Sequence, residues 1–148
     1  MLLIRSLYRP WCFVVSLLLM TTAAQAAVEI RDGYVRGLPP GQPVTAAFMR
    51  LVNSGGSPVN IVAAATDSAE RAEIHTHRHR DGMMSMEQVE SITVPANGAL
   101  RLAPGKFHLM LINLHKPLVE GDTVMIELRT DSGDAITARL PVRSVLNE

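Results

Sequence analysis

The chain has 148 residues, a length that suits one domain, and its 14 basic and 14 acidic residues cancel. This balance gives no basic face or stripe on which nucleic acid could bind. A charged content of 19% beside 47% apolar residues also excludes a disordered chain.

The first 26 residues have the composition of a secretory signal peptide. Arg5 and Arg9 precede a short apolar stretch at residues 11–20, and Ala24-Gln25-Ala26 has the A-x-A pattern of a cleavage site. The apolar stretch is well short of the roughly 20 residues that a membrane-spanning helix needs. We therefore expect a periplasmic protein that is cleaved after Ala26, with no membrane span and a mature domain at residues 27–148.

Cysteine is confined to this leader, where Cys12 is the only one in the chain. The residues before it, Arg9-Pro10-Trp11, are unlike the small and aliphatic residues that precede a lipid-attachment cysteine. A mature chain without thiols forms no disulfide, so its stability has to come from its core.

Beyond the leader, short β-rich runs alternate with turn signals, as is typical of an all-β domain. Gly, Pro, Asn and Asp mark the turns, and only residues 63–71 have a helical composition. Nine strands in one domain indicate a sandwich or a Greek-key barrel. The nine runs expected to be strands are 28–36, 45–53, 59–64, 72–79, 83–89, 99–102, 107–114, 123–130 and 135–142.

Histidine and methionine are concentrated in one part of the sequence. All five His, and four of the six Met that follow the leader, lie between His75 and His115. Nothing in the chain resembles a G-x-S-x-G nucleophile motif or a Gly-rich phosphate loop. The imidazoles and thioethers are therefore the strongest candidates for chemistry.

The dipeptide Asp81-Gly82 predicts a two-residue β-hairpin, because these residues tolerate the positive φ of a type I′ turn. In that register Arg80 pairs with Met83, and the pairs before it bring imidazole opposite thioether. Side chains alternate along each strand, so every second residue shares a face. The face then carries His75, His77, His79, Met84 and Met86. On a later strand, His108 and Met110 share a face for the same reason.

Imidazole nitrogen with thioether sulfur is a donor set that suits Cu(I). Calcium and magnesium prefer oxygen, zinc sites usually use Cys, His or carboxylate, and a blue-copper centre needs a cysteine thiolate. Four donors in two same-face pairs form the candidate set: His75, Met86, His108 and Met110.

Several alternatives remain open on the residues alone. A single Met is usually a packing residue, and this is the interpretation for Met83, whose parity points away from the histidines. His77 and His79 can be ordinary surface residues, or together with Met84 an accessory site that takes Cu(II), which favours nitrogen. Two other classes are a zinc hydrolase with Glu73 or Glu87 as its base, and a metal-free structural or adhesion domain.

The spacing His75, ten residues, Met86, twenty-one residues, His108, one residue, Met110 resembles that of the periplasmic copper A chaperones, the PCu(A)C proteins. The resemblance covers residues 28–142. Further similar blocks are Ala46-Ala47-Phe48, Glu73-Ile74-His75, Asp81-Gly82, Leu102-Ala103-Pro104-Gly105 and Lys116-Pro117-Leu118-Val119-Glu120-Gly121-Asp122.

The resemblance implies a cupredoxin-like Greek-key β-barrel that is not an enzyme and holds one Cu(I) through His75, Met86, His108 and Met110. It also implies delivery of copper to the copper A domain of cytochrome c oxidase subunit II, with general periplasmic copper storage or tolerance as the alternative. Because disulfide reduction needs a thiolate, a Sco-like or thioredoxin-like protein is expected to keep the recipient reduced. We expect a monomer.

Overall fold

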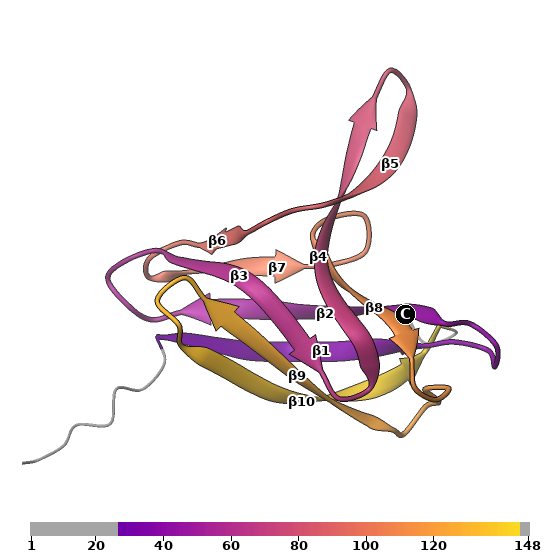
Figure 1. Ribbon diagram of the computed structural model, residues 1–148. Coiled ribbons are helices and arrows are strands. Elements are labelled where there is room, and N and C mark those ends of the chain that lie inside the picture. The colour runs from indigo at the N-terminus through magenta and orange to yellow at the C-terminus, as the bar shows by residue number, and fades with distance from the viewer. Residues whose placement is uncertain (1–26, 146–148) are drawn as a thin grey trace, which may run out of the picture.

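A computed structural model describes residues 27–145, and within that range the chain forms ten β-strands and no α-helix (Figure 1). The signal peptide predicted at residues 1–26 lies outside this range. No helix in the described part is long and apolar enough to cross a membrane. The strands are β1 (Val28–Gly37), β2 (Val44–Asn53), β3 (Val59–Thr66), β4 (Ala69–Arg80), β5 (Met83–Gln88), β6 (Ile92–Val94), β7 (Gly98–Leu102), β8 (His108–Leu114), β9 (Thr123–Thr130) and β10 (Ala135–Ser144).

Seven of the strands close into a barrel in the order β4, β8, β2, β1, β10, β9, β3, and β3 pairs back onto β4. Every neighbouring pair is antiparallel except β1 with β10, which is parallel. Strands β6 and β7 add to β3 and β2. The cupredoxin-like all-β barrel expected from the sequence is therefore confirmed.

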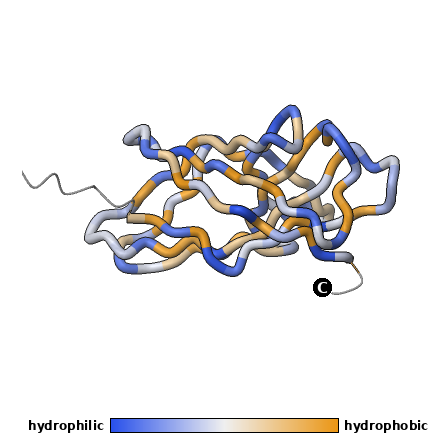
Figure 2. The backbone as a smooth tube through the Cα atoms, turned by 90° about the horizontal axis from the view of Figure 1, so that it is seen from below, coloured by the Kyte–Doolittle hydropathy of each residue, from blue (hydrophilic) through white to orange (hydrophobic). Residues whose placement is uncertain are grey.

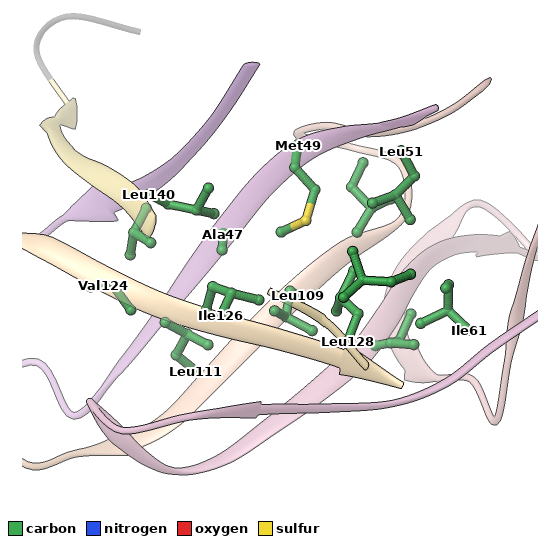
Figure 3. Packing of buried hydrophobic residues seen from close by; sticks show 14 of the residues in the cluster. Ala47, Met49, Leu51, Ile61, Leu109, Leu111, Val124, Ile126, Leu128 and Leu140 are labelled. Carbon is green, nitrogen blue, oxygen red and sulfur yellow. The ribbon is translucent and has the colours of Figure 1, made fainter. Parts of the chain in front are cut away.

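The barrel interior is filled by the side chains of every second residue along each strand, which point inward. Leu109 and Leu111 from β8 lie against Ile126 and Leu128 from β9, and all four are essentially inaccessible to solvent (Figure 3). Figure 2 shows the matching alternation of hydrophobic and hydrophilic residues along the strands. Since neighbouring residues point to opposite faces, the side chains next to these in sequence stand on the outside of the wall.

The strands differ from the predicted pattern in two places. The pattern omits strand β6, because Ile92–Val94 is too short to show an alternation. Residues 63–71, which have a helical composition, form the end of β3, a turn and the start of β4. Here pairing of β3 with β9 and of β4 with β8 overrides the local preference of alanine.

Strand β4 is the element that positions the site. Its first half pairs with β8 inside the barrel wall, whereas its second half leaves the wall and pairs with β5. The resulting β4–β5 hairpin projects from the barrel (Figure 1), and every residue of β5 is exposed. His75 stands at the junction, opposite His108 on one side and Gln88 on the other.

Candidate metal centre

The β4–β5 hairpin has the register predicted from its turn. Asp81 and Gly82 have φ values of 53° and 76°, as a type I′ turn requires at both central positions. Arg80 lies opposite Met83, and the three pairs before them are His79 with Met84, Arg78 with Ser85 and His77 with Met86. The imidazoles of His77 and His79 and the thioethers of Met84 and Met86 therefore stand on one face of the hairpin.

Strand β8 brings its two donors beside that face. His75 pairs with His108 across β4 and β8, and Glu73 pairs with Met110. Because Ile74 and Leu109 point into the core, the residues that flank them point outward. On the outer face of the wall, His75 of β4 therefore lies beside His108 and Met110 of β8.

A groove of about 410 Å³ lies where the hairpin meets the wall. Four of the predicted donors line it: His77 and Met86 from the hairpin, and His108 and Met110 from β8. His75 is not among the residues that line the groove. It lies beside them, because its ring centroid is 6.1 Å from that of His108. The remaining walls are Arg36, Leu38, Val44, Thr45, Ala46, Phe48, Pro104 and Gly105.

His108 is the most deeply placed donor, with 3% of its surface exposed. Its Nδ1 lies 2.9 Å from the carbonyl oxygen of Lys106. A carbonyl only accepts, so Nδ1–H donates and the lone pair of Nε2 stays available. Burial lowers the pKa of His108 below its ordinary value of 6.5, against the opposing effect of the Lys106 hydrogen bond. The imidazole is therefore neutral at pH 7, as a metal ligand must be.

His75 is held through Nε2, whereas His108 is held through Nδ1. Nε2 lies 3.0 Å from Oε2 of Glu73, whose other oxygen lies 3.1 Å from a guanidinium nitrogen of Arg71. The carboxylate accepts, so Nε2–H donates and Nδ1 carries the lone pair. In the described part of the chain, this Nδ1 is buried and has no hydrogen-bond partner. A buried acceptor without a partner is unfavourable unless something binds it.

The outer part of the hairpin carries the three residues predicted as accessory. Nδ1 of His77 lies 3.3 Å from the sulfur of Met84, while His79 stands exposed opposite Met84. The interpretation of Met83 as a packing residue is wrong, because the hairpin projects from the barrel and leaves this side chain 72% exposed.

Glu87, one of the two candidate zinc-hydrolase bases, lies away from the histidines. It pairs with Thr76, on the other face of the hairpin, and forms an ion pair with Arg78. Within residues 27–145, no three side chains of the His, Cys, Asp and Glu types gather as a possible metal site. The donors that do gather are imidazoles and thioethers.

The aromatic and cationic wall of the groove was not predicted from the sequence. The ring of Phe48 lies 6.5 Å from that of His108, and the Arg36 guanidinium lies 5.1 Å from the centre of the Phe48 ring. Glu73 was predicted as a candidate base and as part of the Glu73-Ile74-His75 block, but not as a partner of His75, although its position two residues before His75 could have indicated one.

A comparison with known proteins places this architecture in a family. The family model LpqE-like, described as "Putative lipoprotein LpqE-like", matches residues 28–142. A relative from Leifsonia xyli subsp. xyli, named "Putative lipoprotein Lxx21020", is 30% identical over 117 residues, which span 78% of this chain and 69% of the relative.

Solved structures share the fold. Cu(I)-bound DR1885 from Deinococcus radiodurans is 34% identical with a TM-score of 0.62, over 84% of this chain and 82% of that one. Apo-DR1885 is 30% identical with a TM-score of 0.63 over 97% of both chains. The copper-bound PCuAC domain from PmoF2, at 18% identity, matches in fold with a TM-score of 0.67 over 80% of this chain and 93% of that one. The matched residues and the shared barrel show that the chain belongs to the LpqE-like family.

Proposed function

We propose that this protein is an exported carrier of one Cu(I) ion, bound by His75, Met86, His108 and Met110. The observation that carries the proposal is the convergence of Met86, His108 and Met110 on one groove beside His75. Thioether sulfur and neutral imidazole select Cu(I) over harder ions. The Cu(I)-bound form of DR1885, at 34% identity, supports the same cargo here.

The spacing of the two imidazoles is compatible with one shared ion. Bonds from a metal such as zinc to an imidazole nitrogen are about 2.0–2.1 Å long, so an ion lies roughly 3 Å from the ring centre. Two rings on one ion are then up to about 6.5 Å apart. The rings of His75 and His108 are 6.1 Å apart. Their available nitrogens, Nδ1 and Nε2 respectively, follow from the hydrogen bonds to Glu73 and Lys106.

The arrangement also suits release of the ion. Met86 is 56% exposed on a projecting hairpin, whereas His108 is buried in the barrel wall. A recipient's ligand can therefore displace Met86 first and the deeper donors afterwards, so that the ion is never free in solution. Methionine is flexible enough to follow such an exchange, while the rigid barrel keeps the other donors in place.

The proposed recipient is the copper A domain of cytochrome c oxidase subunit II, with general copper storage as the competing role. The predicted leader at residues 1–26 and the lipoprotein names of the relatives support export to the periplasm. The only cysteine, Cys12, lies in that leader, so a mature monomer has no thiolate with which to reduce a recipient's disulfide. A Sco-like or thioredoxin-like protein would supply that step.

The test is transfer from the Cu(I)-loaded protein to a soluble copper A domain without oxygen or added thiol. One equivalent of Cu(I) should bind tightly, and purple mixed-valence absorption should develop after reoxidation only when the recipient's cysteines were reduced beforehand. Equal loading of an oxidised recipient would contradict the proposed need for a separate thiol protein. Failure to load either form, with Cu(I) still bound by the carrier, would contradict the recipient and favour storage.

A further inference from the structure

The β4–β5 hairpin carries a second group of soft donors beyond the four proposed ligands. Nδ1 of His77 lies 3.3 Å from Sδ of Met84, and His79 is the cross-strand neighbour of Met84. Met84 is 61% exposed, so the burial of an apolar side chain does not explain its place. The contact joins an imidazole nitrogen and a thioether sulfur, two atoms that can both bind a soft metal ion.

We propose that His77, Met84 and His79 form a second, outer Cu(I) site through which the ion enters and leaves the inner groove. The inference rests on the proposed function for the nature of the cargo. Its donors are separate from the inner four, so the two sites can be tested independently.

The distance of 3.3 Å between Nδ1 of His77 and Sδ of Met84 suits two donors to one ion. Bonds from a metal such as zinc to imidazole nitrogen and to sulfur are about 2.0–2.3 Å long. A first-row ion with bonds of that length can therefore bridge two donors 3.3 Å apart without moving the backbone. His79 stands directly opposite Met84, and directly opposed side chains in an antiparallel pair are about 4.5–5.5 Å apart at Cβ, so its imidazole is the candidate third donor.

The arginines of the hairpin do not oppose a cation on this face. The two arginines of the outer part of β4 alternate with the histidines, and therefore point to the other face. Arg78 is paired there with Glu87, and Arg80 stands opposite Met83. The face with His77, His79 and Met84 thus carries no guanidinium from the hairpin itself.

His77 connects the outer site to the groove. Its ring is 5.1 Å from that of His108, and it lines the groove together with Met86. Exposure falls along this path from 61% at Met84 through 56% at Met86 to 3% at His108. When Met84 and His79 release the ion, His77 would therefore still bind it beside the next donors, Met86 and His108.

Methionine methyl resonances read the two sites separately. Cu(I) is added anaerobically to protein labelled at the methionine methyl carbons, from zero to two equivalents. We expect the first equivalent to shift the resonances of Met86 and Met110, and the second to shift that of Met84. Met83, which is on the same hairpin but on its other face, should not respond to either.

Three variants complete the test, in titrations against a chromophoric Cu(I) chelator. Met84→Leu and His79→Asn should lose the second equivalent and keep the first, while Met83→Leu, the matched control, should keep both. The outer site is overturned if Met84 does not shift, if it shifts together with Met86 at the first equivalent, if Met83 shifts equally, or if Met84→Leu still binds two ions. Unshifted Met86 and Met110 would instead contradict the proposed function, and the Met84 result would still be readable.

Discussion

Glu73 fixes the orientation of His75 by accepting a hydrogen bond from Nε2 across 3.0 Å. The carboxylate is itself oriented by Arg71, 3.1 Å from its other oxygen. Carboxylates that hold a ligating histidine in this way set its tautomer and raise its basicity. In the proposed site, the pair therefore keeps the lone pair of the buried Nδ1 available to the ion.

Removing the Glu73 carboxylate should weaken copper binding. We expect Glu73→Ala to lower Cu(I) affinity by about 10–100-fold, the usual cost of losing such a partner. Glu73→Gln should recover part of that loss, because its amide oxygen still accepts a hydrogen bond. The measurement is competition with a chromophoric Cu(I) chelator.

The matched control is Glu87→Ala, which removes a carboxylate that pairs with Arg78 on the other face of the same hairpin. Its Cu(I) affinity should equal that of the parent. If Glu73→Ala and Glu87→Ala have the same affinity, Glu73 does not position the ligand.

The buried imidazole of His108 predicts a pH dependence of the copper-free protein. Burial lowers its pKa below 6.5, so between the two values the unfolded chain binds a proton that the folded chain does not. The free energy of unfolding must then fall as the pH is lowered through that window. Urea denaturation between pH 7.5 and 5 measures this slope.

A His108→Asn variant identifies the source of the slope, since its side chain does not titrate. We expect the variant to lose less stability than the parent between pH 6.5 and pH 5, whatever its absolute stability. Parallel pH profiles for the two proteins would show that His108 does not carry the effect.

The hairpin turn should affect copper binding more than global stability. Gly82 has a φ of 76°, and a Cβ added there would meet no atom within 4 Å, so Gly82→Ala adds only backbone strain. Left-handed backbone costs a non-glycine residue about 1–2 kcal/mol. Because the hairpin projects from the barrel, we expect this strain to loosen Met86 and weaken Cu(I) binding, with the thermal midpoint nearly unchanged.

Gly133→Ala is the control, since Gly133 has a φ of 92° and equally open surroundings in the turn between β9 and β10. It imposes similar strain within the barrel, so it should lower the thermal midpoint and leave copper affinity intact. If Gly82→Ala lowers the thermal midpoint and Gly133→Ala weakens copper binding, the hairpin does not act as an independent part of the site.

Local sequence rules predict the hairpin and fail for contacts between distant segments. Asp81-Gly82 fixes the register that brings His77 opposite Met86, and parity alone places His108 and Met110 on one face. The pairing of His75 with His108 depends on how β4 meets β8, which no local pattern encodes. The same limit hides the wall formed by Phe48 from β2.

The proposed site requires thioether sulfur from both the hairpin and the barrel wall. The most direct test compares the Cu(I) affinity of the parent with that of Met86→Leu and Met110→Leu, at one equivalent of copper. These substitutions nearly conserve volume and should cost less than about 1.5 kcal/mol of stability. We predict that each variant stays folded and loses more than about 100-fold in affinity, because even partners outside the ligand set are worth about 10–100-fold. Affinities equal to that of the parent in both variants would contradict the proposed site.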